Sequence, residues 1–241
     1  MRRTLDIEAL AAVLPGRQFL EARRRGKFLL LDTGPAGSLL LHLGMSGVIQ
    51  LVPAAASFRA HTHLILELDD GRELRFVDPR RFGMAVWLEP GEEADDPSLG
   101  VLGMEPLDPS LSQSLPPLIR NRRAPIKSLL LDQHLVAGIG NIYAAEALWR
   151  AGIHPRRAGH RISLARLLAL TDAVQEVLAE AITQGGTTLR DFATPDGNSG
   201  YFAVNLQVYG RQGEPCLRCG ATLRAEAVGG RMTAWCPRCQ R

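Results

Sequence analysis

Cysteine is missing from the first 215 residues of this 241-residue chain, and the four cysteines present all lie between positions 216 and 239. None is therefore left for a disulfide in the rest of the chain. No apolar run is long enough to span a bilayer, and nothing upstream of the cysteines resembles a signal peptide. These absences argue against a disulfide-rich secreted scaffold and against a membrane-spanning protein. They predict a soluble, cytoplasmic protein.

Lysine is almost absent as well. Of 28 basic residues only Lys27 and Lys127 are lysine, so arginine supplies the general positive charge. A lysine offers a compact ammonium group with a tunable pKa, which arginine cannot supply. The two lysines are therefore candidate functional residues, with chance as the alternative explanation for so small a number.

Positive charge is unevenly divided along the chain. Residues 1–119 carry 12 basic and 16 acidic side chains, whereas residues 120–241 carry 16 basic and 9 acidic ones. Such an asymmetry is typical of a protein in which one half meets a polyanion. A solvated basic surface without a partner would show the same balance, so charge alone does not separate the two interpretations.

The cysteines form two Cys-x-x-Cys pairs separated by sixteen residues, at Cys216, Cys219, Cys236 and Cys239. This spacing is typical of a closed tetrahedral zinc site that holds structure and leaves no open position for a substrate. Two disulfides are the alternative, which the lack of a secretory signal disfavours. Five arginines lie in the same segment, so we expect the zinc hairpin to contact phosphate: Arg218, Arg224, Arg231, Arg238 and Arg241.

The N-terminal part of the chain predicts short strands without helices between them. Close spacing of this kind favours an antiparallel β-sandwich or barrel. The hairpin signal Asp69-Asp70-Gly71 separates two of the strands. The expected strands are Gln18–Arg25, Lys27–Asp32, Ser38–Leu43, Val48–Val52, Thr62–Leu68, Glu73–Val77 and Met84–Leu88.

Beyond residue 88 the pattern changes. Residues 89–117 are acidic and then rich in proline and serine, which is typical of a linker. Helical periodicity follows over Ile126–Leu135 and Ile142–Ala151. The expected fold is α+β and multidomain: an antiparallel β-sandwich domain over residues 1–108, a helical domain over 109–207 and a zinc hairpin over 208–241.

A longer helix is expected to begin after Ser163 as its N-cap and to end at Gly185-Gly186. Its expected buried face consists of Leu164, Leu167, Leu168, Val174, Leu178 and Ile182.

A glycine-rich turn joins the first two of these helices. Gly138 and Gly140 allow a tight turn, and the free amides at the start of the next helix then face outward. Such amides form a binding site for an anion such as a phosphate, and the Asn141 side chain can donate a hydrogen bond to the same phosphate. Taken alone, this turn would equally suit an ordinary corner between two helices.

Together with its neighbours, the segment 126–146 closely resembles the helix–two-turn–helix element of formamidopyrimidine-DNA glycosylases. Further blocks agree in order and spacing, at residues 23–30, 41–47, 78–83, 187–192, 200–202 and 208–211 and in the zinc hairpin. The resemblance implies base-excision repair by a bifunctional glycosylase and lyase. Such enzymes remove 8-oxoguanine and formamidopyrimidines from duplex DNA and then cleave the backbone. It also implies a DNA-bound monomer with one structural zinc ion and no membrane association.

The resemblance assigns roles to four residues of the β domain. Lys27 corresponds to the lysine that contacts phosphate beside the lesion and assists elimination. Met45, Arg80 and Phe82 correspond to the residues that fill the gap left by a flipped-out nucleotide, which restores part of the lost stacking. A surface lysine at a strand end, and core packing for Met45 and Phe82, are the plainer alternatives.

Other positions correspond to backbone contacts of the family. His61 and Arg122 match two of these, although His61 could cap a strand and Arg122 has equivalent neighbours. Lys127 and Asn141 match phosphate contacts in the helical domain. Arg231 matches the arginine that grips the phosphates flanking the lesion and is linked to the second elimination.

The loop Thr187–Tyr201, which contains Asp196-Gly197, resembles the oxidised-purine branch and suits a segment that folds over a flipped base. A plain surface loop is the alternative.

The first residues depart from the family pattern. The family nucleophile is the amine of an N-terminal proline followed by a catalytic glutamate, whereas this sequence begins Met-Arg-Arg-Thr-Leu-Asp-Ile-Glu. We therefore expect this chain as given to lack the nucleophile. Two hypotheses stay open: an enzyme whose first segment is absent from this sequence, or a paralogue that binds damaged DNA without cutting it.

Overall fold

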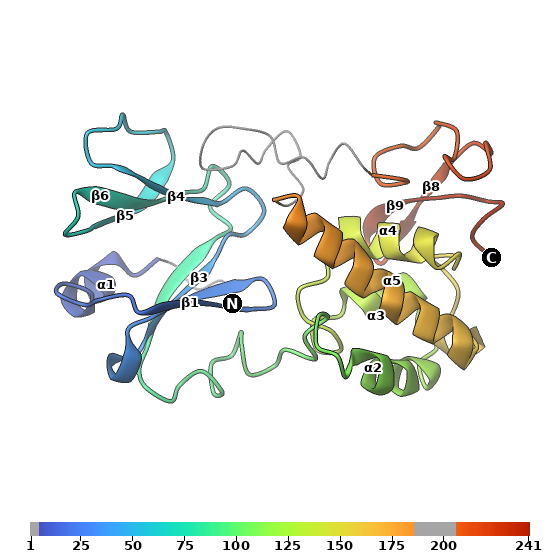
Figure 1. The fold of residues 1–241 in the computed structure, drawn as a ribbon, viewed down its shortest axis with the longest axis horizontal. Coiled ribbons are helices and arrows are strands. Elements are labelled where there is room, and N and C mark those ends of the chain that lie inside the picture. The colour runs from blue at the N-terminus through green and yellow to red at the C-terminus, as the bar shows by residue number, and fades with distance from the viewer. Residues whose placement is uncertain (1–4, 186–205) are drawn as a thin grey trace. The chain divides into compact units, whose positions relative to one another are not determined.

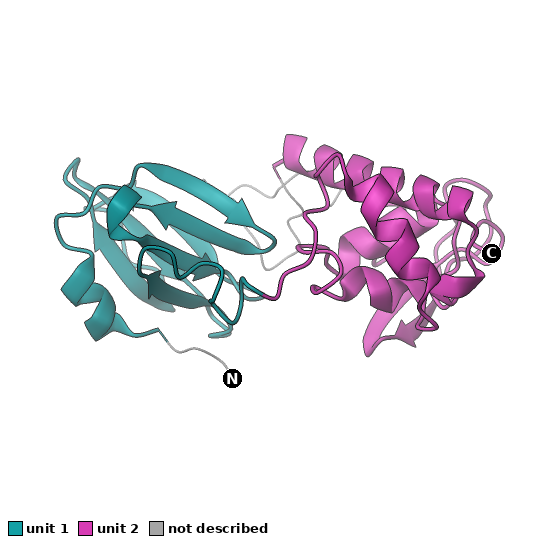
Figure 2. Ribbon diagram, turned by 90° about the horizontal axis from the view of Figure 1, so that it is seen from below, with its two compact units in different colours: residues 1–100, 188–200 teal, residues 101–187, 201–241 magenta. Residues whose placement is uncertain are grey.

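The computed structural model of the protein describes residues 5–185 and 206–241, so the loop Thr187–Tyr201 lies outside the described residues. The described chain divides into two compact units, shown in teal and magenta in Figure 2. Unit 1 is residues 5–100, and unit 2 is residues 101–185 with 206–241. Each unit carries its own core, and each is described by itself below.

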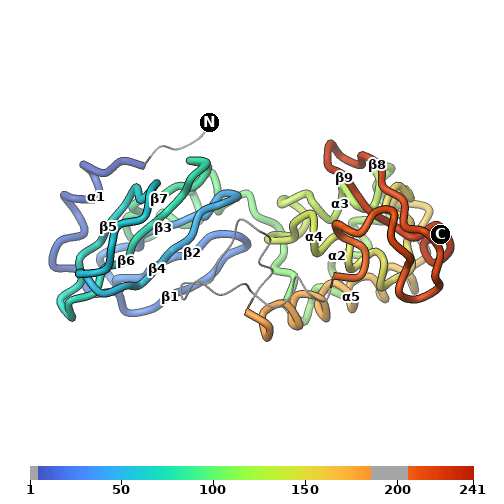
Figure 3. The backbone as a smooth tube through the Cα atoms, turned by 90° about the horizontal axis from the view of Figure 1, so that it is seen from above, coloured from blue at the N-terminus to red at the C-terminus, as the bar shows by residue number. Residues whose placement is uncertain are grey.

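Unit 1 contains two antiparallel sheets and one short helix, α1 (Ile7–Val13), as Figures 1 and 3 show. The first sheet has the strand order β1-β2-β3-β7, and the second has the order β4-β6-β5. Their bounds are β1 Glu21–Arg25, β2 Phe28–Asp32, β3 Ser38–His42, β4 Val48–Pro53, β5 Thr62–Glu67, β6 Arg72–Val77 and β7 Met84–Leu88. All seven predicted strands are present, and only β1 begins as much as three residues later than expected.

The core of unit 1 lies between its two sheets. Strand β3 is an inner strand of its sheet, and its three consecutive leucines at positions 39 to 41 are all buried, so side chains on both of its faces are covered. Phe76 of β6 is fully buried and packs in one cluster with side chains of the other sheet. The cluster consists of Leu10, Leu31, Leu39, Leu41, Leu64, Phe76 and Ala85. The predicted antiparallel sandwich is thereby confirmed.

Unit 2 combines helices with a two-stranded hairpin. The helices are α2 Leu111–Arg120, α3 Ile126–Leu131, α4 Asn141–Arg150 and α5 Leu164–Thr183, and the hairpin strands are β8 Arg224–Val228 and β9 Arg231–Trp235. One apolar cluster joins α2, α3, α4 and α5, and a second joins α4 to the cysteine region. The helical element and the zinc hairpin expected from the sequence are both present. None of the helices within residues 5–185 and 206–241 is long and apolar enough to cross a membrane.

Three expectations about the helices were wrong in detail. Helix α2 begins inside the expected linker, residues 89–117, extends beyond it and contains Pro116 and Pro117. Its leucine and isoleucine side chains at positions 111, 115 and 119 form a fully buried stripe, whose burial offsets the backbone hydrogen bonds that proline removes. Helix α3 ends at Leu131, because Asp132 is extended and its carboxylate accepts from the His134 amide at 3.0 Å.

The buried face of α5 is also shifted from the expected one. Leu164, Leu168 and Ile182 are exposed. Leu167 and Val174 face the core as expected, and the partly buried Leu178 packs against it. The rest of the buried face consists of Leu170, Thr171, Ala173, Val177 and Ala181. The helix contains many more apolar residues than one face can hold, so the pattern alone did not select the correct stripe.

Candidate nucleic-acid interface and metal centre

The four cysteines converge on one point in unit 2. Their Sγ atoms all lie within 4.8 Å of one another, with 3.9 Å between Cys216 and Cys239 and 3.5 Å between Cys219 and Cys236. Four thiolates that each bind one zinc ion at about 2.3 Å stand roughly 3.8 Å apart. The cysteines therefore fit a closed tetrahedral zinc site.

The environment of these thiols differs from one to the next. Burial opposes ionisation of Cys216, but nearby hydrogen-bond donors, among them the amides of Arg218 and Cys219, outweigh it and lower the Cys216 pKa to about 6. Burial and the neighbouring thiols raise the pKa of Cys239 to about 12. Zinc binds cysteine as the thiolate, so binding of the metal releases the protons that these thiols still hold.

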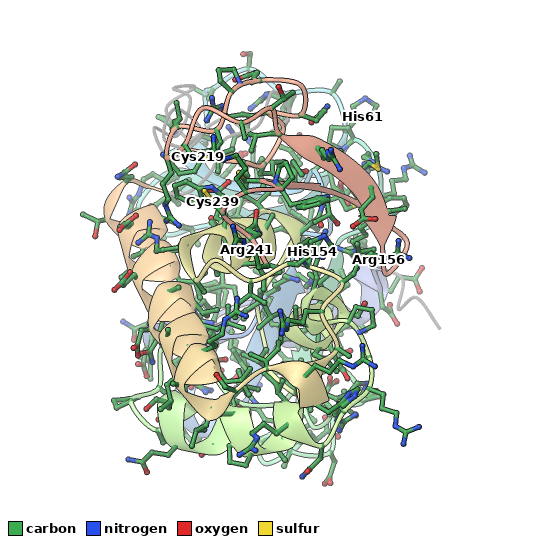
Figure 4. The ribbon with its side chains drawn as sticks, turned by 90° about the vertical axis from the view of Figure 1, so that its right-hand side faces the viewer. His61, His154, Arg156, Cys219, Cys239 and Arg241 are labelled. Carbon is green, nitrogen blue, oxygen red and sulfur yellow. The ribbon has the colours of Figure 1, made fainter. Side chains whose placement is uncertain are left out.

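The metal centre is fixed to the C-terminal end of α4. Gln240 accepts a hydrogen bond from the Cys236 amide at 2.8 Å and donates to the Ile153 carbonyl at 3.0 Å. The Arg218 guanidinium lies 4.2 Å from the centre of the Trp149 ring. Figure 4 shows Cys219 and Cys239 close together, with Arg241 beside them. The chain on both sides of the cysteines is thus attached to the helical part of unit 2.

The opposite end of the hairpin lies on α3 and α4. The turn between β8 and β9 is Gly229-Gly230, and both glycines have positive φ, as a tight hairpin requires. A Cβ atom on Gly229 would stand 2.8 Å from the Ser128 hydroxyl of α3. The exposed Arg231 follows the turn as the first residue of β9.

Lys127 and Asn141 hold this end of the hairpin. The Lys127 side chain is fully buried, and its ammonium donates to the Thr233 hydroxyl and to the Met232 carbonyl, the latter at 3.4 Å. The Asn141 amide donates to the same Met232 carbonyl at 3.2 Å. Burial and the Arg231 cation lower the pKa of Lys127 to about 8. Three residues predicted from the sequence, Lys127, Asn141 and Arg231, therefore meet at one place.

The glycine turn before α4 is shaped by a residue that sequence analysis did not select. Gln133 accepts from the Gly138 amide at 2.9 Å and donates to the Leu131 and Ile139 carbonyls, both at 3.1 Å. Gly138 has a φ of 80°, as the turn requires. Gly140, the N-cap residue of α4, has no side chain that could cap the helix, and the positive end of the helix dipole lies at this turn.

Arg122 lies apart from that group, in the loop between α2 and α3. It lines an open depression of about 660 Å³ together with Asn121, Arg123, Ala124, Ser128, Leu129 and Asp132. Ser128 of α3 also lies close to the hairpin turn, so α3 lines this depression and contacts the end of the hairpin that carries Arg231.

In unit 1 a buried carboxylate organises the loops that carry the other predicted residues. Asp78 is 1% exposed and accepts from the Ser46 hydroxyl at 2.8 Å and from the Gly83 amide at 2.7 Å. The Arg80 amide lies 3.3 Å from the same carboxyl group. Burial opposes ionisation, but these donors outweigh it and hold the Asp78 pKa below its usual value. Asp78 therefore ties the loop around residue 45 to the loop around residue 80.

Met45, Arg80 and Phe82 are presented on these two connected loops. Met45 is 56% exposed, and the Arg80 guanidinium lies 4.8 Å from the centre of the Phe82 ring. A Cβ atom on Gly44 would stand 2.6 Å from the Phe82 backbone, so only glycine allows the loops to approach this closely. An apolar side chain and a planar cation on an aromatic ring thus project from one rigid support.

Lys27 lies in the turn between β1 and β2, where the sequence placed it. The partly buried His42 is its neighbour, because Phe28 pairs with His42 across β2 and β3. Burial and the Lys27 charge lower the pKa of His42, and its Nδ1 accepts from the Gly44 amide at 3.0 Å. His42 is therefore neutral, with its proton on Nε2. Its place in the block 41–47 was a signal that could have identified it.

His61 is exposed and has a φ of 69°, which is rare for a residue with a side chain. Its carbonyl accepts from the Asp78 amide at 2.9 Å. Its neighbour His63 contacts the Asp78 carbonyl through Nε2 at 3.0 Å. The strained conformation at His61 thus supports the same loop as Asp78.

Models of known protein families match three parts of this chain. Residues 1–85 match the formamidopyrimidine-DNA glycosylase N-terminal domain, residues 102–193 its H2TH domain, and residues 213–241 the zinc finger found in FPG and IleRS. A formamidopyrimidine-DNA glycosylase of Stenotrophomonas maltophilia is 52% identical over 233 residues, covering 96% of this chain and 85% of its own. One of Xanthomonas euvesicatoria is 50% identical over 235 residues, covering 97% and 86%.

Solved structures show the same likeness. The MutM (Fpg) protein of Thermus thermophilus has a TM-score of 0.87 at 41% identity, covering 95% of this chain and 85% of its own. Lactococcus lactis Fpg in complex with DNA containing an abasic site has a TM-score of 0.90 at 32% identity, covering 100% and 89%. The zinc-finger match and the clustered thiols together confirm the predicted structural zinc site.

Proposed function

This chain belongs to the formamidopyrimidine-DNA glycosylase family, and from that premise we propose that it acts in base-excision repair on oxidised purines in duplex DNA. The proposed activities are removal of the damaged base as a glycosylase and cleavage of the DNA backbone as a lyase, and both need the family's N-terminal proline nucleophile, which the sequence given does not include. One copy of the chain carries all of the sites described above, so we infer that it works as a monomer. Its substrate is genomic DNA, which places its work at the nucleoid.

The observation that carries this proposal is the paired loop support in unit 1. A nucleotide that is flipped out of a duplex leaves a gap, at a cost of a few kcal/mol in lost stacking. Met45 and Phe82 offer apolar surface to fill that gap, and Arg80 offers a planar cation with hydrogen-bond donors for the base left on the opposite strand. Asp78 holds both loops together, so the protein is prepared for the gap before DNA arrives.

Unit 2 supplies binding that does not depend on base sequence. Arg231 is exposed at the tip of the hairpin, and the N-terminus of α4 begins at Asn141 after the glycine N-cap. Guanidinium groups and helix N-termini are suited to phosphate oxygens, and such contacts position a protein without reading sequence. We assign phosphate contact to Arg231, Asn141 and Arg122 in this unit and to Lys27 and His61 in unit 1. Lys127, whose side chain is fully buried, acts by holding the hairpin that carries Arg231.

Zinc, when bound to the four cysteines, supplies folding free energy to the hairpin and no reactive position. The residues of the chain do the rest. The hairpin carries Arg231 at one end, and its other end is joined to α4 through Gln240. In unit 1, the neutral His42 offers a second donor beside the Lys27 ammonium. These groups orient the DNA backbone around the damaged nucleotide.

The proposal is tested with duplexes that carry a single 8-oxoguanine, a single abasic site or no lesion. We expect the protein to bind both damaged duplexes more tightly than the intact one, and we expect affinity to fall steeply with salt. Strand cleavage at 8-oxoguanine tests the chemistry separately from binding. Equal affinity for damaged and intact duplex would overturn the proposal.

A further inference from the structure

The tip of the zinc hairpin contains a buried hydroxyl group between two cations. Thr233 is 1% exposed, and its hydroxyl donates to the Arg231 carbonyl at 3.0 Å. The same oxygen accepts a hydrogen bond from the Lys127 ammonium. One hydroxyl therefore connects the residue that carries the exposed guanidinium to a fully buried ammonium on another element.

The local backbone does not by itself fix Arg231. The turn that precedes it is Gly229-Gly230, and neither glycine has a side chain that could hold the tip in place. Arg231 pairs with Val228 at the end of the two-stranded ladder, where strands fray most easily. Restraint must come from outside the hairpin.

That restraint comes from α3 and α4. Lys127 reaches the Thr233 hydroxyl and the Met232 carbonyl, and Asn141 reaches the same carbonyl at 3.2 Å. A buried ammonium needs oxygen partners, because an unsatisfied buried charge is costly. The threonine hydroxyl supplies one of the two contacts that Lys127 makes with the hairpin, and it simultaneously fixes the carbonyl of Arg231.

Valine in place of threonine would keep the branched shape and remove the oxygen. Lys127 would then lose an acceptor and the Arg231 carbonyl would lose a donor. The strand would still form, since neither lost bond belongs to the ladder between β8 and β9. Only the anchoring of the tip would change.

We propose that Thr233 is a positioning residue for phosphate recognition, which acts by holding Arg231 against the Lys127 anchor. The inference rests on the proposed function, because it assigns Thr233 a part in binding DNA through Arg231. Thr233 itself touches no DNA.

The test compares Thr233→Val with Thr233→Ser and with a matched control, Thr171→Val. Thr171 is also 1% exposed and lies in unit 2, but its hydroxyl donates to Leu168 of its own helix. We expect Thr233→Val to weaken binding to an abasic-site duplex by about tenfold, the usual effect of losing a buried hydrogen bond to a charged group. Thr233→Ser and Thr171→Val should bind as the unaltered protein does.

A double-mutant cycle with Arg231→Ala separates positioning from general weakening of the fold. If Thr233 acts through Arg231, then Thr233→Val should cause no further loss of affinity once the arginine is gone. Zinc content and the melting temperature are measured for every variant. If Thr233→Val does not fold, the Thr233→Ser variant provides the test. It must keep the DNA affinity of the unaltered protein and must lose affinity when Arg231 is replaced by alanine.

Two results would overturn the inference. One is an equal loss from Thr233→Val in the presence and in the absence of Arg231. The other is a folded, zinc-loaded Thr233→Ser variant that binds as weakly as Arg231→Ala. Failure of the proposed function gives a different result, namely that the unaltered protein shows no preference for the abasic-site duplex over an intact one.

Discussion

The two units hold their exposed functional residues in place with buried charges of opposite sign. In unit 1 the carboxylate of Asp78 collects N–H and O–H donors from two loops. In unit 2 the ammonium of Lys127 collects oxygen acceptors from the zinc hairpin. Asp78 belongs to a sheet domain with its own apolar core, whereas Lys127 anchors a hairpin that depends on a metal. A buried charge therefore holds the exposed residues in both units, but only in unit 2 does this support depend on a bound metal.

Removal of zinc should show the largest difference between the units. Metal binding supplies most of the folding free energy of so small a hairpin, on the order of 10 kcal/mol in isolated zinc fingers. Chelation should therefore unfold the segment around β8 and β9 and abolish DNA binding, while unit 1 stays folded. Metal analysis and hydrogen exchange before and after chelation check this. A purified protein without stoichiometric zinc would contradict it.

Asp78→Asn should damage unit 1 alone. An amide in this place turns an N–H group toward the donors that now bind the carboxylate, at a cost of about 2 kcal/mol. Preference for damaged DNA should fall, because Met45 and Arg80 lose their common support. Zinc content should not change. Asp96→Asn, which alters another buried carboxylate of unit 1, serves as the control.

The Asp78 carboxylate should also make the stability of unit 1 depend on pH in the acid range. The pKa of Asp78 is lower in the folded protein than in the unfolded chain. The stability that it contributes is therefore complete above the ordinary aspartate pKa, near 4, and is lost as pH falls through the lower folded value. Acid unfolding of unit 1 should be less steep in Asp78→Asn. Superimposable acid-unfolding curves for the two proteins would rule this out.

Arg231→Ala in unit 2 should have a smaller effect, which is a loss of DNA affinity. Loss of one phosphate contact should weaken binding to damaged and intact duplexes by the same factor and reduce the salt slope by about one. Melting temperature should stay the same, because Arg231 is exposed. A selective loss of affinity for damaged DNA would show that Arg231 reads the lesion rather than the backbone.

Titration of the Lys127 ammonium should give the smallest effect on stability and DNA affinity, and this effect should appear only at alkaline pH. Its folded pKa is about 8 against an ordinary value of 10.5, so between these values the unfolded chain holds a proton that the folded protein has released. Its contribution to stability therefore rises with pH across this range, while DNA affinity falls as the ammonium loses its charge. Melting and binding from pH 7 to 10 should show both trends, and Lys127→Met should lack them.

Local patterns in the sequence predicted much of this molecule. Strand signals located all seven strands of unit 1, and cysteine spacing located the metal centre. The helix α2 was missed, because its two prolines and two serines are typical of a linker and the buried stripe at positions 111, 115 and 119 is short. The buried face of α5 was misjudged because apolar residues occur on several of its faces.

The contacts that hold the candidate binding residues in place could not be predicted from local sequence patterns. Lys127 and Thr233 are 106 positions apart, and Asp78 and Ser46 are 32 apart. Neither pair belongs to a local motif, so only the folded chain shows that they meet. The sequence suggested candidate binding residues such as Met45, Arg80 and Arg231. The structure adds residues that hold their loops, namely the buried Asp78 and Thr233 and the partly buried Gln133.

The most direct test of the division between lesion recognition in unit 1 and phosphate binding in unit 2 is the affinity of Arg80→Ala for abasic-site and intact duplexes. We expect weaker binding to the abasic-site duplex opposite cytosine and nearly unchanged binding to the intact one, so that the ratio of the two affinities falls. An equal loss on both duplexes would contradict the assignment of Arg80 to the gap, because it would make this arginine one more phosphate contact.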